Sequence, residues 1–166
     1  MPIRLKKRHF VTGGVISALL LTVVFFLVFM TGSYSVTAAP DGGSRECASV
    51  VTELPRIVTG EKSQETTGAG TTAWGDGKIV LRCGVTPLDP TTNLCMTVDG
   101  VDWVLDEAKA KNSGPRALTT YGRHPAIEVT INDSALSPGD VLVDLNRTVK
   151  QIPQGDRKCI SLDDVN

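Results

Sequence analysis

The first part of the chain carries one long hydrophobic run. Residues 10–30 are 21 positions without a charge, and sixteen of them are apolar. A helix of that length spans about 31 Å, close to the ~30 Å hydrocarbon core of a bilayer. The run therefore predicts a single transmembrane helix over residues 10–30. The tail before it, residues 1–9, holds four Lys or Arg and no acid, which favours a cytoplasmic N-terminus and export of the rest.

A cleaved secretory signal peptide is the second interpretation of this segment. Residues 36–39 read Val-Thr-Ala-Ala, so cleavage after Ala38 or Ala39 would leave small residues at positions −3 and −1 relative to the cleavage site. Signal peptides have a shorter apolar region of about 7–15 residues, so we favour a retained anchor. Both interpretations place the following domain outside the cytoplasm, and cleavage would make the protein secreted.

Two later stretches have the period of amphipathic helices. In residues 44–54, apolar side chains recur at i, i+3, i+4 and i+7, beginning with Cys47. Residues 137–140 read Ser-Pro-Gly-Asp, an N-cap followed by Pro at the first helical position and an acid in the first turn. The apolar period continues to Ile152, and Pro153 ends this second helix.

Alternation of apolar and polar residues predicts strands over residues 78–85, 117–121 and 126–132. The clearest signal is a hairpin over residues 94–105, because Asp99-Gly100 between two alternating runs is a pair that type I′ turns prefer. Residues 60–73 and 106–115 lack an apolar period and predict loops, the first of them mobile.

The order of these elements predicts an α+β domain, a small antiparallel sheet with two helices packed on it. We expect a polar stem over residues 31–45 and a disulfide-braced extracytoplasmic domain over residues 46–166. The chain has 17 basic and 18 acidic residues; without the four basic residues of the tail, residues 40–166 have a net charge of −5. An acidic domain lacks the large basic surface that nucleic acid requires, so we expect no nucleic-acid partner.

All four cysteines follow the hydrophobic run, which indicates disulfides in an exported domain. Their spacings of 36, 12 and 64 residues lack the close pairs of a zinc site, so we expect no metal. Cys47 and Cys83 lie on the apolar faces of a predicted helix and strand, which favours a Cys47–Cys83 bridge. Cys95 points to the other face of the hairpin, where a C-terminal segment with Cys159 could cross, which favours Cys95–Cys159.

Five side chains are candidates for a surface that contacts a partner: Trp74, Arg82, Tyr121, Arg123 and His124. Aromatic rings can stack on a glycan or peptide, and guanidinium groups bind carboxylates and other anions. The structural alternatives are a core position for Trp74 and ion pairs with Asp76 or Asp102 for the two arginines.

Four short motifs punctuate the domain: Trp-Gly-Asp at 74–76, Leu-Arg-Cys-Gly at 81–84, Gly-Val-Asp-Trp at 100–103 and Thr-Tyr-Gly-Arg-His-Pro at 120–125. Together with the apolar N-terminal segment and the Cys47…Leu54-Pro55 start, they resemble a family of uncharacterised actinobacterial envelope proteins, catalogued as a domain of unknown function. The resemblance covers about residues 45–160. It implies a membrane-anchored or secreted domain, but no established activity.

The sequence has no motif of the common hydrolases or nucleotide-binding sites, so we expect no cofactor and favour a protein without enzymatic activity. We expect a membrane-anchored binding module of the cell envelope, with an envelope protein or cell-wall component as its partner. One alternative is an envelope hydrolase or transferase using His124 with Glu128 or Asp102 as its acidic partner. Another is a structural subunit of a membrane complex that makes its contacts through residues 10–30.

Overall fold

A computed structural model describes residues 33–160 of the chain. The tail and the predicted transmembrane helix, residues 1–9 and 10–30, lie outside the described residues. Within residues 33–160, no helix has both the length and the apolar character needed to cross a membrane.

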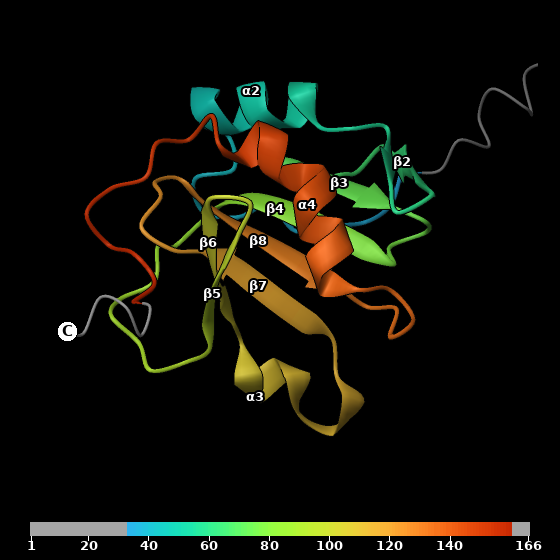
Figure 1. Cartoon of the computed structure of the whole chain (residues 1–166). Helices are drawn as coiled ribbons and strands as arrows, with labels where there is room; N and C mark the ends of the chain where they lie inside the picture. Colours follow the sequence, from blue (N-terminus) through green and yellow to red (C-terminus); the bar gives the residue numbers. More distant parts are fainter. Residues whose placement is uncertain (1–32, 161–166) are drawn as a thin grey trace, which may run out of the picture. The chain divides into compact units, whose positions relative to one another are not determined.

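The described residues form an α+β domain around one antiparallel sheet of eight strands (Figure 1). The strand order is β1-β2-β3-β4-β8-β7-β6-β5. The strands are β1 Ile57–Val58, β2 Glu61–Gln64, β3 Thr71–Trp74, β4 Ile79–Val85, β5 Cys95–Val98, β6 Val101–Leu105, β7 Arg116–Thr120 and β8 Ala126–Ile131. The helices are α2 Arg45–Glu53, α3 Glu107–Ala110 and α4 Pro138–Val149, and a short 3₁₀ turn spans Lys111–Ser113.

One face of the sheet is apolar and forms the core with α2 and α4. Leu81 of β4 lies opposite Val129 of β8, which in turn lies opposite Leu118 of β7, so a row of fully buried side chains crosses the sheet. Both α2 and α4 contribute buried side chains to this same cluster. Figure 1 shows α4 crossing in front of the sheet with α2 beside it, and the two helices contact each other. The antiparallel sheet with helices on it is therefore confirmed.

The predicted helix starts and the hairpin are confirmed in detail. The hydroxyl of Ser44 accepts a hydrogen bond from the backbone N–H of Cys47 at 3.2 Å, as an N-cap does. In the hairpin, Met96 lies opposite Trp103, and both residues of the turn, Asp99 and Gly100, have positive φ. A type I′ turn needs positive φ at both positions, so local turn chemistry set the pairing of β5 with β6.

The two predicted loops contain regular structure. Residues 60–73 include β2 and most of β3, so the prediction of a mobile loop there is wrong. The side chains of β2 are polar and partly exposed, and its backbone hydrogen bonds are supplied by neighbouring strands, so no apolar alternation marks it. Residues 106–115 include α3, which Asp106 caps, but four residues are too short to show a helical period.

The segment predicted as a stem belongs to the domain from Ser33 onward. Tyr34 forms a bridge with Thr66, and the backbone N–H of Asp41 donates to the carbonyl of Gly84 at 3.0 Å. Ala39 is buried. Backbone hydrogen bonds, which side-chain patterns do not reveal, attach this segment to β4.

Both predicted disulfides are confirmed. Cys47–Cys83 joins α2 to β4, and both cysteines are fully buried. Cys95–Cys159 joins β5 to the C-terminal segment on the other face of the sheet, and both of its cysteines are half-buried. The two bridges thus brace opposite faces of one sheet.

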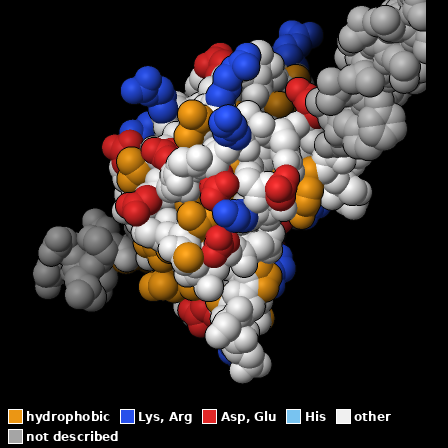
Figure 2. Space-filling model, turned by 90° about the vertical axis from the view of Figure 1, so that its right-hand side faces the viewer, with side chains coloured by type: hydrophobic (Ala, Val, Ile, Leu, Met, Phe, Trp, Pro, Cys, Tyr) orange, Lys and Arg blue, Asp and Glu red, His pale blue; other side chains and the backbone are white. Residues whose placement is uncertain are grey.

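The outer surface carries charges of both signs. In the view of Figure 2, acidic side chains lie between the basic ones across the visible face. This face therefore does not present a single sign of charge.

Candidate functional site

Trp74 lies in the core and not on the surface. Its side chain is fully buried, and its indole Nε1 donates to the carbonyl of Pro55 at 2.9 Å. A ring in this position cannot stack on an external glycan or peptide. Trp74 is therefore a core residue and not part of a contact surface.

Arg82 lies on the other, polar face of the sheet and is engaged in an ion-pair network. Its guanidinium pairs with Glu128 at 3.2 Å, and Lys109 pairs with the second oxygen of the same carboxylate at 3.1 Å. Partial burial lowers the pKa of Lys109, but its hydrogen bonds and charge interactions with Glu128 and Asp106 outweigh that effect and raise it. The partner of Arg82 is thus Glu128, from the neighbouring strand, and not Asp76 or Asp102.

Arg123 is buried, with 5% of its surface exposed. One guanidinium nitrogen donates to the carbonyl of Ile152, and another donates to the carbonyl of Gly100 at 3.4 Å. Its Nε has no hydrogen-bond partner, and no carboxylate among residues 33–160 lies within 4.0 Å of it. Burial lowers the pKa of Arg123, and the charge of Asp102 partly opposes this.

Tyr121 is half-buried and connects this turn to the C-terminal segment through its backbone. Its N–H donates to the carbonyl of Asp102 at 2.8 Å, and its carbonyl accepts from Nε2 of Gln154 at 2.8 Å. Gln154 also donates to the carbonyl of Arg157 at 2.7 Å, while its own Oε1 is buried without a partner. The turn before His124 is therefore fixed against residues 153–157.

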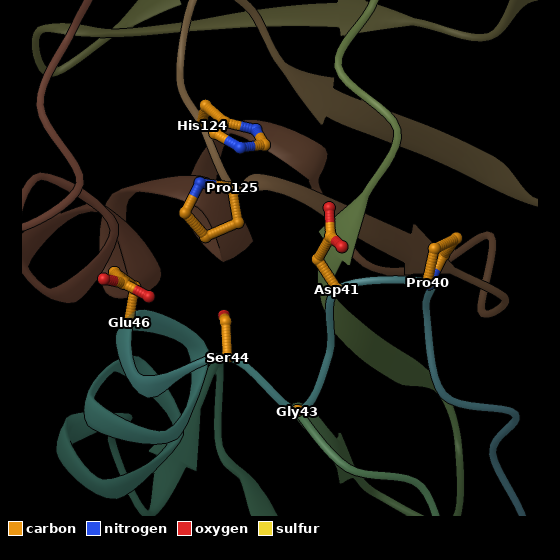
Figure 3. Close-up of a pocket in the computed structure, with 7 residues that line it drawn as sticks. All are labelled: Pro40, Asp41, Gly43, Ser44, Glu46, His124 and Pro125. Atoms are coloured by element: carbon orange, nitrogen blue, oxygen red, sulfur yellow. The ribbon is translucent and has the colours of Figure 1, made fainter.

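His124 is exposed and borders three surface depressions. The largest, about 520 Å³, is shown in Figure 3 and is lined by Pro40, Asp41, Gly43, Ser44, Glu46, His124 and Pro125. Two smaller ones, of about 300 and 270 Å³, adjoin it. His124 is thus the residue common to the three hollows.

The largest depression is acidic. Figure 3 shows Ser44 and Glu46 at the start of α2. The carboxylate of Asp41 points toward the side of the depression that His124 borders. The hydroxyl of Ser44 already caps α2. The second depression lies between α2 and residues 151–153 and has a partly apolar floor that includes Val50.

The third depression is basic. Its lining includes Arg123, His124 and Arg157, together with Asp156 and Pro87. Arg157 donates to the carbonyl of Leu88 at 2.7 Å and lies 3.7 Å from an oxygen of Asp89. The residues that line this hollow thus include two arginines and the exposed His124.

The acids expected to assist His124 are engaged elsewhere. Glu128 pairs with Arg82 and Lys109, and Asp102 accepts from the hydroxyl of Thr97 at 2.6 Å and from the N–H of Cys159 at 2.9 Å. In the part of the chain that the structure describes, no hydrogen bond joins His124 to an acidic side chain. The hollow around His124 therefore holds no formed acid–base pair.

Within residues 33–160, no group of three His, Cys, Asp or Glu side chains is arranged to hold a metal ion.

Comparison with known protein families finds a match over residues 16–156, to the family described as "Protein of unknown function (DUF3515)". The chain belongs to the DUF3515 family. This confirms the resemblance to a domain of unknown function, and the family description names no activity. No curated protein and no solved structure matches the chain.

Several residues of this surface carry no signal in the sequence. Asp41 and Glu46 lie in and just after the segment predicted as a stem, and Arg157 lies in a polar stretch after the last helix. None of them belongs to a motif or an apolar period. Only the fold brings them to His124, so no local signal could have identified them.

Proposed function

We propose that this DUF3515 protein is a membrane-anchored binding module of the cell envelope that holds its partner at the surface around His124. The segment 10–30 would be the anchor, with the N-terminus in the cytoplasm and the disulfide-braced domain outside; cleavage after Ala38 or Ala39 would release the domain as a secreted protein. The motif resemblance to actinobacterial envelope proteins agrees with this compartment.

The two disulfides support an extracytoplasmic location. Disulfides form and persist in oxidising compartments and are rare in the cytosol. The uncharged run of 21 residues behind a basic tail supports export by an independent argument.

One observation carries the proposal of binding: three depressions adjoin one another at His124. Ligand sites are concave and combine apolar surface with a few convergent polar groups, and these hollows offer both. The walls belong to α2, to the turn at 122–125 and to residues 151–157, and disulfides tie the first and last of these to the sheet. A wall held in this way loses little freedom on binding.

Glu128 and Asp102 already bind other groups of the domain, and this favours a binding function over catalysis by an acid–base pair with His124. In the common arrangement for nucleophilic catalysis, a histidine base is itself oriented by a hydrogen bond to a third group, often a carboxylate. The exposed ring of His124 can instead donate or accept a hydrogen bond to a ligand, which a binding surface requires.

Site-specific photo-crosslinking in living cells tests this proposal on the full-length chain. A photoreactive amino acid replaces Ser49, an exposed residue of the second depression; the control replaces Val143, which is 53% exposed on α4. We expect one defined envelope adduct from position 49, none from position 143, and loss of the adduct when His124→Ala is added. An adduct that is the same from both positions, or that survives His124→Ala undiminished, would overturn the proposal.

An exchange of the anchor separates this function from that of a structural subunit. Replacing residues 10–30 by an unrelated transmembrane segment should preserve the adduct from position 49. Loss of the adduct, with the protein still in the membrane, would instead favour contacts made by the native segment.

A further inference from the structure

We infer that the domain stands on the bilayer surface through an entry region, formed by β2 and the turn 75–78, and turns the surface around His124 away from the membrane. This inference rests on the proposed anchor over residues 10–30 and names the side from which the partner arrives. Three features of the fold carry it: the place where the chain enters the domain, the direction in which it then runs, and the end of the sheet at which His124 lies.

The chain enters the fold at Tyr34. The backbone N–H of Tyr34 donates to the carbonyl of Glu65 at 2.8 Å, and its carbonyl accepts from the N–H of Thr67 at 3.1 Å. The side chain reaches the turn before β4, because a Cβ on Gly77 would collide with the hydroxyl of Tyr34. Both the backbone and the ring of Tyr34 thus lie against this part of the sheet.

The tether between the proposed anchor and Tyr34 is short, since it consists of residues 31–33. An extended chain advances at most about 3.3–3.6 Å per residue, so the path from residue 30 to Tyr34 covers no more than about 14 Å. The eight strands of the sheet, spaced about 4.8 Å apart, span roughly 34 Å. The tether is therefore shorter than the sheet is wide, and it keeps the entry region close to the bilayer.

After Tyr34 the chain runs toward the far end of β4. A parallel bridge joins Tyr34 to the β2–β3 connection, so the segment follows the direction of β2 and arrives from the end that holds the turn 75–78. Further along, the carbonyl of Thr37 accepts from Nε of Arg82 at 3.1 Å. The N–H of Asp41 then donates to the carbonyl of Gly84 at 3.0 Å, near the end of β4.

His124 lies at this far end of the strands. Strand β4 begins at Ile79, directly after the entry region, and ends at Val85, which pairs with Ala126 of β8. His124 precedes Ala126 by two residues and shares the largest depression with Asp41. At about 3.3 Å per residue, the two ends of β4 are about 20 Å apart. The partner of the His124 surface therefore arrives from the outer side, as an envelope protein or wall polymer does and a lipid headgroup does not.

The charges of the entry region suit a headgroup surface. Lys78 pairs with Glu61 at 2.7 Å and lies 3.9 Å from an oxygen of Asp133, and its side chain is 45% exposed. Figure 2 views the molecule from the side on which β2 and β3 lie in Figure 1, and acidic and basic side chains lie side by side there. Charged groups are costly in hydrocarbon, so this region rests on the headgroups and does not insert.

The candidate cleavage site lies within the segment that crosses the sheet. Ala39 is buried, and its carbonyl accepts from the N–H of Gly42 at 3.0 Å. The N–H of Val36 donates to Oγ1 of Thr67 at 3.1 Å. Cleavage after Ala39 would remove the contacts of residues 34–37 from the domain, which favours the retained anchor on which the orientation depends.

Quenching of fluorescence by nitroxide lipids tests the orientation on the full-length chain in phosphatidylcholine nanodiscs. A fluorescent amino acid replaces Lys62, an exposed residue of β2, or Ser49, the exposed residue of the second depression. In the test sample, part of the lipid carries a nitroxide on its headgroup. We expect the nitroxide to remove most of the fluorescence at position 62 and little at position 49. Equal losses at the two positions, or a larger loss at position 49, would overturn the orientation.

A longer tether is the matched control. Inserting about twenty Gly and Ser residues after Gly32 adds a flexible segment with a mean end-to-end distance of about 25 Å. The loss at position 62 should then fall toward that at position 49, because the domain can leave the bilayer surface. An unchanged loss at position 62 would overturn the role of the short tether.

The result is separable from that of the proposed function. Quenching at position 62 without a crosslink from position 49 would refute the envelope partner alone. A crosslink from position 49 with equal quenching at the two positions would refute the orientation alone.

Discussion

The indole of Trp103 and the amide of Asn146 meet in the interior of the domain, where Nε1 of the tryptophan donates to Oδ1 of the asparagine at 3.2 Å. Nδ2 of Asn146 donates in turn to the carbonyl of Val98 at 2.6 Å. Both side chains are fully buried. A single asparagine of α4 thus contacts both strands of the β5–β6 hairpin and sets the position of the helix on the sheet.

Replacing Asn146 by Ala should destabilise the domain substantially. The change leaves the buried indole N–H without its partner, at a cost of about 1–3 kcal/mol, and also removes the partly buried hydrogen bond to the carbonyl of Val98. Urea unfolding followed by tryptophan fluorescence measures this loss. Arg147→Ala, on the exposed side of the same helix, is the control and should change the unfolding free energy by less than about 0.5 kcal/mol. Equal effects of the two variants would contradict the role of Asn146.

Gly84 should tolerate no side chain. Its φ is 87°, and an added Cβ would collide with the backbone of Asp41, whose N–H donates to the carbonyl of Gly84 at 3.0 Å. Gly84→Ala should cost at least about 1–2 kcal/mol from the left-handed backbone alone, and the collision adds to this. Gly43→Ala is the matched control, because a Cβ there meets no atom within 4 Å. Thermal unfolding of the two variants checks the difference, and a Gly84→Ala variant as stable as Gly43→Ala would refute it.

The two disulfides should respond differently to reduction under native conditions. Cys47 and Cys83 are fully buried, whereas Cys95 and Cys159 are half-buried, so a mild reductant should open Cys95–Cys159 first. Alkylation of the freed thiols followed by peptide mapping measures the order. Simultaneous opening of both bridges, or earlier opening of Cys47–Cys83, would be inconsistent with this difference in access.

Removal of each bridge by paired Cys→Ala substitutions should lower the unfolding free energy by about 4 kcal/mol in the chain-entropy model. Urea unfolding of the Cys95→Ala/Cys159→Ala and Cys47→Ala/Cys83→Ala variants measures these losses. A variant as stable as the native chain would contradict the prediction for the bridge that it lacks.

Asp106 should make the stability of the domain depend on pH. Its carboxylate accepts from the backbone N–H of Lys109 at 3.0 Å, and this hydrogen bond, supported by the charge of Lys109, lowers the pKa of Asp106 below its ordinary value of 3.8. A carboxyl with a lowered pKa in the folded state stabilises the fold above its unfolded pKa, and this contribution disappears as the pH falls through the lowered value.

The test compares Asp106→Ala and Asp106→Asn with the native chain. Loss of the cap in Asp106→Ala should cost about 1 kcal/mol at neutral pH, and the difference should shrink in acid as the native carboxylate is protonated. Asparagine is an equally good N-cap without a charge, so Asp106→Asn should retain most of the stability at neutral pH. Urea unfolding at several pH values measures this, and a difference between native and Asp106→Ala that does not vary with pH would argue against the ionised cap.

Much of the fold was predictable because its signals are local. The Asp99-Gly100 pair set the hairpin, Ser44 and Ser137 marked the helix starts, the helical period gave Cys47 its face, and strand alternation gave Cys83 and Cys95 theirs. The edge region of β1 to β3 was not predictable, since its strands have only two to four residues, too few to show a period, and are held by backbone hydrogen bonds to neighbours. Of the candidate site, His124 is exposed, and Arg82 and Tyr121 are half-buried. Trp74 and Arg123 are buried.

The sequence by itself determined the α+β class, the places of the main helices and strands, and the pairing of the cysteines. It also showed the run of 21 uncharged residues in the N-terminal segment. These features depend on the period of side chains along a short stretch of chain. Only the tertiary structure decided which polar residues surround His124, because Asp41 and Glu46 come from residues 41–46 and Arg157 comes from the C-terminal segment, both far along the chain from His124. Their meeting results from the packing of α2 and the C-terminal segment against the sheet, and no pattern within any one segment records it.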